Sequence, residues 1–100
     1  MIQIVAVTPK QIQVVLSGEL CTAEAKMIRE SLTGYIDSGN SSISIDLSQV
    51  DHIDRNGLGA LVFIHLRADE KQGRFVIRGL QGKLKELFEL ARLDKVFYIE

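Results

Sequence analysis

The chain has 100 residues, of which 46% are hydrophobic and 25% charged, and its twelve basic and thirteen acidic side chains leave a net charge of −1. This balance is typical of a globular protein, and the length predicts a single domain over residues 1–100. No apolar run approaches the roughly 20 residues of a membrane span, and the lone cysteine can form no internal disulfide. The charges are also too evenly balanced for binding to phosphate backbones, which argues against nucleic-acid partners. The missing basic leader segment and the lone cysteine predict a cytoplasmic protein.

The first predicted element is a β-hairpin. Residues 2–7 are rich in β-branched side chains, and residues 11–16 alternate polar and apolar side chains before a Ser-Gly pair. Thr8 to Lys10, around the only proline, supplies the turn between the two strands. The alternation indicates that the second strand is half buried, with one face on the core.

An amphipathic helix and a third strand follow. Apolar residues recur at three- and four-residue steps from Ala25 to Ile36, with charged residues between them. Thr22 is the expected N-cap, Glu24 lies in the favourable first turn, and residues 37–40 supply the stop. Residues 42–47 alternate again, which predicts a strand with its isoleucine and leucine side chains on one face.

The second half alternates between helices and strands. After a loop over residues 48–54, an almost continuous apolar run predicts a largely buried helix from about 56 to 71. A short strand at 74–78, an amphipathic helix at 83–91 and a last strand at 96–99 complete the chain. The resulting ββαβαβαβ order predicts an α/β fold whose mixed sheet is antiparallel at the N-terminal edge and otherwise parallel.

The loop before the buried helix is the first place to look for a functional site. In an open α/β sheet, sites form where strand ends meet helix N-termini. The loop leads into Gly57-Leu58-Gly59, whose small residues let other backbone come close, and the free N–H groups of a helix start can hold an anion. Such a short Gly-x-Gly segment is more often a tight turn or close packing than a ligand site.

The residues around this loop form a longer pattern. It consists of Ile45-Asp46-Leu47-Ser48-Gln49-Val50, Ile53-Asp54 and Gly57-Leu58-Gly59-Ala60-Leu61, with supporting pieces at residues 16–20 and 84–93. The pattern covers almost the whole chain in order and resembles the STAS domain family, specifically the stand-alone anti-sigma factor antagonists of bacteria. The resemblance implies a STAS-type fold, no catalysis, and a partner that is a kinase-like anti-sigma factor or a related GHKL-type serine kinase homologue.

The resemblance also implies a partner-binding surface at the loop and the start of the next helix, without a cofactor or metal. We expect this surface at Ile53, Asp54, Arg55, Asn56, Gly57 and Leu58. In the family, a serine or threonine directly after the aspartate accepts a phosphate, whose charge and bulk break the contact. Here that position is Arg55, and Cys21 stands where the family usually has an acidic residue. We therefore hypothesise partner binding without the usual phosphorylation switch.

Two residues allow more than one interpretation. The planar guanidinium of Arg55 could pair with a carboxylate or phosphate of the partner, or it could be a solvated side chain near Asp51 or Asp54. Cys21 is a small buried filler or, alternatively, a reactive thiol whose pKa is lowered at the helix start. Ser48 directly follows the predicted strand, and we expect it to be structural.

The remaining expectations concern chemistry and assembly. His52 and His65 lack a metal-ligand spacing, and we interpret them as a turn residue and a helix-flank residue. Without a nucleophile or a histidine cluster, no enzymatic activity is expected. A monomer or a weak dimer through the edge strand at residues 2–7 is expected. The alternative function is an accessory STAS subunit of a lipid or anion transport assembly.

Overall fold

The computed structural model describes residues 2–8 and 11–100, apart from the side chains of residues 6 and 7. The elements follow one another as β1 (Ile2–Val7), β2 (Gln11–Leu20), α1 (Thr22–Asp37), β3 (Ser42–Ile53), α2 (Arg55–Glu70), β4 (Phe75–Arg78), α3 (Gly82–Leu90), the short 3₁₀ helix η1 (Leu93–Lys95) and β5 (Tyr98–Ile99). This is the predicted ββαβαβαβ order.

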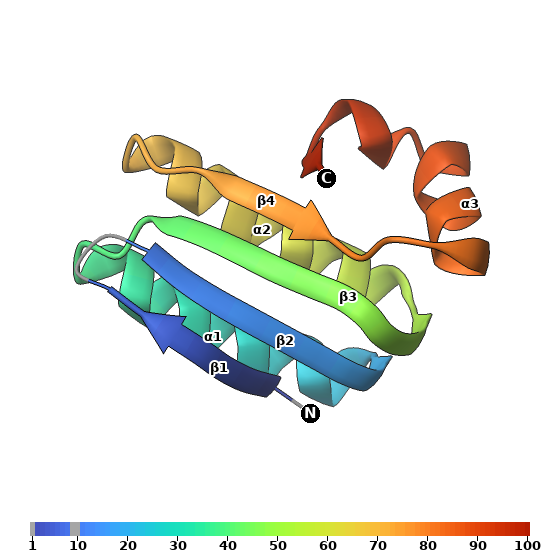
Figure 1. Ribbon diagram of the computed structural model, residues 1–100, viewed down its shortest axis with the longest axis horizontal. Coiled ribbons are helices and arrows are strands. Elements are labelled where there is room, and N and C mark those ends of the chain that lie inside the picture. Colours follow the sequence, from blue (N-terminus) through green and yellow to red (C-terminus); the bar gives the residue numbers. More distant parts are fainter. Residues whose placement is uncertain (1, 9–10) are drawn as a thin grey trace.

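The strands form one five-stranded sheet in the order β1-β2-β3-β4-β5 (Figure 1). β1 pairs with β2 antiparallel, and the other neighbours are parallel, which confirms the predicted mixed sheet. Ile45 pairs with Val14 on one side and with Ile77 on the other. All three side chains are at most 1% exposed, so this row crosses the middle of the core face.

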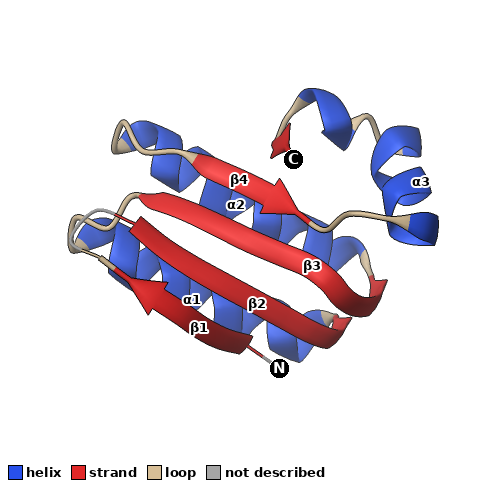
Figure 2. Cartoon of the chain, in the orientation of Figure 1, coloured by secondary structure: helices blue, strands red, loops and turns tan. Residues whose placement is uncertain are grey.

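Helices α1 and α2 lie on one face of the sheet, and no helix of the described residues covers the opposite face (Figure 2). α1 buries residues at three- and four-residue steps against the sheet, and α2 does the same: Ala25, Ile28, Leu32 and Ile36 from α1, and Gly57, Ala60, Leu61, Ile64 and Ala68 from α2. The burial pattern confirms the predicted amphipathic and largely buried helices. α3 lies beyond the ends of the strands rather than over them (Figure 1).

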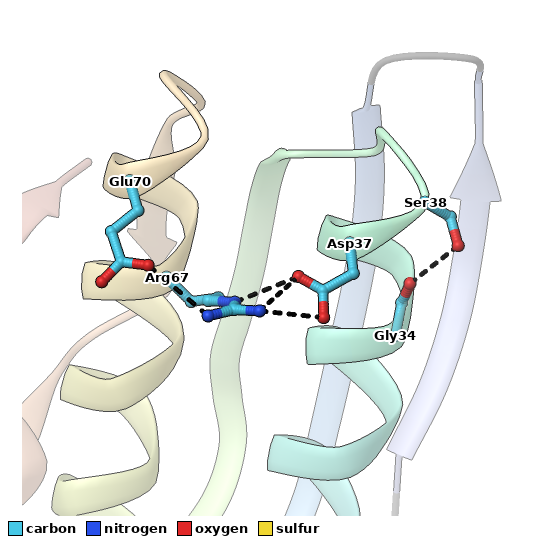
Figure 3. A network of polar contacts seen from close by, with 5 residues as sticks. All are labelled: Gly34, Asp37, Ser38, Arg67 and Glu70. Carbon is cyan, nitrogen blue, oxygen red and sulfur yellow. Dashed lines mark hydrogen bonds and ion pairs between the residues drawn. The ribbon is translucent and has the colours of Figure 1, made fainter.

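A polar network joins α1 and α2 near their C-terminal ends (Figure 3). The Arg67 guanidinium donates hydrogen bonds to both carboxylate oxygens of Asp37, at 3.0 and 3.1 Å. Glu70 lies 3.5 Å from the same guanidinium. The Arg67 and Asp37 side chains are 37% and 41% exposed, so we expect the pair to stabilise the fold by about 1 kcal/mol at most.

The third strand is longer than the sequence pattern predicts. β3 continues from Leu47 to Ile53, so residues 48–53 are strand and only Asp54 separates β3 from α2. β2 likewise continues to Leu20, and the two extensions pair with each other through two register shifts. Leu47, Val50 and Ile53 are buried, and the residues between them are exposed. The spacing between buried residues therefore changes from two to three where the register shifts. The predicted loop over residues 48–54 is therefore wrong.

Two other boundaries differ from the prediction. The N-cap of α1 is Cys21 rather than Thr22, with an extended backbone and an N–H that donates to the Glu24 carboxylate at 3.1 Å. The last strand is limited to Tyr98–Ile99, because the N–H groups of Val96 and Phe97 both donate to the Leu93 carbonyl, at 3.0 Å, rather than to a neighbouring strand. At the predicted hairpin turn, the Thr8 N–H donates to the Gln11 carbonyl at 2.8 Å, and Pro9 and Lys10 lie outside the described residues.

Candidate functional site

The start of α2 is organised by Asp54, the one residue between β3 and the helix. Asp54 has an extended backbone, and its Oδ1 accepts a hydrogen bond from the Gly57 N–H at 2.9 Å. This is the geometry of an N-cap, which satisfies one of the free N–H groups of the first turn. The hydrogen bond from Gly57 is the main cause that lowers the pKa of the Asp54 carboxyl below its ordinary value. Asp54 therefore has a structural role that the sequence prediction did not assign to it.

Gly57 lets the first turn of α2 lie directly against the end of β2. A Cβ atom at this position would overlap the carbonyl oxygen of Leu20 and would lie 2.7 Å from Cγ1 of Ile53. The prediction of close backbone approach is confirmed at Gly57. It is wrong at Gly59, where a Cβ would meet no atom within 4 Å.

The N-termini of α1 and α2 are linked to each other. The Asn56 side-chain amide donates to the hydroxyl of Thr22 at 3.0 Å, and the Asp54 N–H donates to the Leu20 carbonyl at 3.3 Å. The site is thus formed by two segments more than 30 residues apart in the sequence. No local sequence signal points to Thr22 as a neighbour of Asn56.

Cys21 lies beside Asp54 in this arrangement and is half buried. Desolvation and then the negative charges of Asp54 and Glu19 raise the pKa of the Cys21 thiol above its ordinary value. A thiol whose pKa is raised is mostly protonated at neutral pH and is a poor nucleophile. The interpretation of Cys21 as a thiol activated by the helix start is therefore wrong.

Arg55 is the first residue of α2, and its side chain is exposed. Across residues 2–8 and 11–100, no carboxylate forms an ion pair with it, so the expected proximity to Asp51 or Asp54 produces no salt bridge. A positive charge at a helix N-terminus is unfavourable by about 0.3–1 kcal/mol when it is exposed. At the start of α2, the described part of the chain thus leaves the Arg55 guanidinium without a salt bridge.

The six residues expected to bind a partner differ in accessibility. Arg55 and Asn56 are exposed, Asp54 and Leu58 are half buried, and Ile53 and Gly57 are buried. Ile53 is only 4% exposed and packs in the core, so it supports the surface from beneath. The expected set omits Thr22, which lies beside the exposed Asn56, and Cys21, which lies beside the half-buried Asp54.

Other polar residues singled out in the sequence have separate surroundings. Ser48 donates its backbone N–H to the Asp46 carboxylate at 2.8 Å, and this bond is the main cause that lowers the pKa of Asp46. His52 is exposed near the end of β3, whereas the His65 ring packs against Phe97 with centroids 5.5 Å apart. Within the described chain, no three His, Cys, Asp or Glu side chains gather as a metal site would require. None of its helices is long and apolar enough to cross a membrane.

The five-stranded mixed sheet with two helices on one face defines an α/β protein of the STAS type. This chain resembles SpoIIAA, an anti-sigma factor antagonist solved in its unphosphorylated form, with a TM-score of 0.82 and 18% sequence identity. The superposition covers 100% of this chain and 87% of the SpoIIAA chain. An anti-sigma factor antagonist from Mycobacterium paratuberculosis gives a TM-score of 0.83 at 20% identity, with 99% of this chain and 83% of that chain covered. These likenesses establish the fold.

The sequence comparison defines the family. The family model described as "Mlab, STAS domain" matches residues 5–99, and the chain therefore belongs to the STAS domain family. The anti-sigma-B factor antagonist of Listeria monocytogenes is 29% identical over 89 residues, which cover 89% of this chain and 78% of the relative. The family resemblance predicted from the residues around the start of α2 is thus confirmed.

Proposed function

We propose that this protein is an anti-sigma factor antagonist that binds a kinase-like anti-sigma factor of the GHKL type through the start of α2. The contact surface consists of the accessible side chains of Asp54, Arg55, Asn56 and Leu58, with Ile53 and Gly57 holding the backbone in place. The observation that carries the proposal is the exposed Arg55 guanidinium, which no ion pair within the described chain neutralises. The relative from Listeria, named an anti-sigma-B factor antagonist, supports the class of partner.

The chemistry of Arg55 suggests what the partner presents. A guanidinium offers a planar fork of N–H donors that matches a carboxylate in two parallel hydrogen bonds. The helix N-terminus adds a partial positive charge at the same place. We therefore propose that an aspartate or glutamate of the anti-sigma factor lies against Arg55 in the complex. The electrostatic cost of Arg55 in the free chain is then recovered on binding.

We also propose that the start of α2 lacks a phosphorylation switch. From Asp54 to Gly59 no side chain has a hydroxyl group, and an arginine cannot accept phosphate from a serine kinase. The relative SpoIIAA has been solved in a phosphorylated form. In this chain a fixed positive charge occupies the position where the family acquires a negative one, so binding is expected to persist in the presence of ATP.

A pull-down with a charge-reversed variant tests the proposal. Tagged wild-type protein, Arg55→Glu and the control Lys71→Glu are compared, and the captured proteins are identified by mass spectrometry. Lys71 is the exposed C-cap of α2, so its variant makes the same charge change at the opposite end of the same helix. We expect capture of a GHKL-type protein by wild type and Lys71→Glu, and its loss with Arg55→Glu. Equal capture by all three chains contradicts the role of Arg55.

The second candidate function is an accessory STAS subunit of a lipid or anion transport assembly. It is favoured by one observation, namely that the matching family model is described as Mlab rather than as an anti-sigma factor antagonist. The same pull-down separates the two proposals. Capture of a membrane transport ATPase in place of a GHKL-type protein would support the accessory subunit and reject the anti-sigma partner.

A further inference from the structure

A hollow of about 540 Å³ lies among α3, η1 and β5, within the range of roughly 300–1,000 Å³ that is typical of small-ligand pockets. Its apolar wall includes Leu80, Phe88, Phe97, Tyr98 and Ile99. Phe88 is fully buried and Phe97 is 6% exposed, and their ring centroids are 6.0 Å apart. The hollow therefore has a fixed aromatic base, and none of these residues belongs to the proposed partner surface.

The position of α3 explains why this space is not filled by the chain itself. Phe88 is the fully buried residue of α3, whereas Leu84 and Leu87 are half buried and Leu90 is 84% exposed. Gly79, which precedes the helix, and Gly82, its first residue, both have positive φ angles, which turn the chain away from the end of β4. In Figure 1, α3 lies beyond the end of β4, and the chain then returns to the C-terminus beside β4, where β5 pairs with it.

Of the charged side chains that line the hollow, more are acidic than basic. Glu89 and Asp94 both line it, and no ion pair neutralises either carboxylate in the described part of the chain. Glu100 also lines it but is bound by the Arg78 guanidinium at 2.8 Å. Lys85 is the basic lining residue. The unpaired carboxylates thus outnumber the ammonium group.

The backbone of α3 adds to this negative potential. The helix ends at Leu90, one residue after Glu89, so its last carbonyl groups carry the partial negative charge of a helix C-terminus. Aromatic rings also attract cations through their faces, and the Tyr98 ring of this wall already has the Arg74 guanidinium 4.9 Å from its centroid. Carboxylates and helix carbonyls favour a positively charged ligand, and the exposed side chains of Tyr98 and Ile99 favour an apolar body.

We infer that this hollow binds a small organic cation with an aromatic or aliphatic body, of the class of arylalkylamines. The apolar body would lie against Leu80, Tyr98 and Ile99, above the buried rings of Phe88 and Phe97, and the ammonium group would lie at the rim near Glu89 and Asp94. This ligand site is independent of partner binding at the start of α2. Its test therefore uses the free protein.

A nuclear magnetic resonance titration with two compounds of opposite charge tests the inference. The ¹⁵N-labelled full chain is titrated with 2-phenylethylamine and, separately, with 3-phenylpropionate, which has a similar body and a carboxylate. We expect saturable shifts of the Phe97, Tyr98 and Ile99 amides with the amine, with a dissociation constant in roughly the millimolar range for so small a ligand. The anion is expected to give no saturable shifts there.

Matched variants test the role of the carboxylates. The double variant Glu89→Gln with Asp94→Asn is expected to weaken amine binding by about fivefold or more, as loss of charge-assisted contacts should. The control Glu86→Gln neutralises an exposed carboxylate of α3 that does not line the hollow, and it is expected to leave the affinity unchanged. The inference is overturned if the amine and the anion bind equally well, or if the shifts with the amine do not saturate. It is also overturned if the saturable shifts lie elsewhere in the chain, or if Glu86→Gln weakens amine binding as much as the double variant does. The comparison of the two compounds needs no variant, so it stands even if the double variant fails to fold.

Discussion

The substitution Gly57→Ala probes the contact that fixes α2 against the sheet. The added methyl group would overlap the Leu20 carbonyl oxygen, a backbone atom, and would lie 2.7 Å from Cγ1 of Ile53. Leu20 and Ile53 pair with each other at the ends of β2 and β3, so neither can move without disturbing the sheet. Overpacking of this kind costs about 1–3 kcal/mol. Because alanine favours a helix over glycine by about 1 kcal/mol, part of this cost is offset, and a net destabilisation of about 0–2 kcal/mol is expected.

Gly59→Ala is the matched control for this prediction. It makes the same change two residues later in α2, at an exposed position where the methyl group meets no atom within 4 Å. Only the helix preference remains, so we expect stabilisation by about 0.5–1 kcal/mol. Urea denaturation followed by circular dichroism at 222 nm measures both free energies of unfolding. If Gly57→Ala is as stable as Gly59→Ala, the close packing of α2 on Leu20 is refuted.

Four further outcomes are expected. Incubation with the kinase-type partner and ATP should leave wild-type protein without phosphate near Arg55, whereas Arg55→Ser should become phosphorylated, as read by intact-mass and peptide mass spectrometry. Phosphate at the start of α2 in wild-type protein would contradict the absence of a phosphorylation switch. The rate of Cys21 alkylation by iodoacetamide should rise with pH with a midpoint above the ordinary thiol pKa of about 8.5. Asp54→Asn should lower that midpoint, because asparagine still caps the helix but the negative charge that raises the thiol pKa is removed. The pKa of the Asp54 carboxyl is lowered in the folded state, so the stabilisation by the ionised carboxylate is complete above the unfolded pKa of about 3.9 and disappears as the pH falls through the folded pKa. Asp54→Asn should therefore lose less stability than wild type between about pH 5 and pH 2, as measured by urea denaturation. Asp37→Asn should cost about 1 kcal/mol or less through the loss of its ion pair with Arg67, and an undiminished difference in 1 M salt would contradict an electrostatic origin.

The element order and the sheet pattern could be predicted because apolar periodicity reports burial directly. α1 and α2 bury residues at the expected helical steps, and β3 buries Ile43, Ile45 and Leu47 at the expected step of two. The prediction failed after Leu47, where register shifts between β2 and β3 change the step to three. Such shifts depend on pairing with a strand 30 residues away, and the local sequence holds no record of them.

The site could be predicted only in part for the same reason. The family resemblance located the start of α2, and the small residue at Gly57 indicated close backbone approach. The bond between Asn56 and Thr22, and the proximity of Cys21 to Asp54, arise because α1 and α2 begin side by side. The preference of aspartate for N-cap positions was the one available signal for the role of Asp54.

Once a GHKL-type anti-sigma factor has been identified by pull-down, its binding surface can be mapped on the ¹⁵N-labelled protein. We expect that adding the unlabelled partner shifts or broadens the amide signals of Asp54, Arg55, Asn56 and Leu58 most strongly, with smaller effects at Cys21 and Thr22. The outer face of the sheet and the C-terminal end of α2 should remain unchanged. Strongest effects at either of those places, with the start of α2 unaffected, would contradict partner binding at the start of α2.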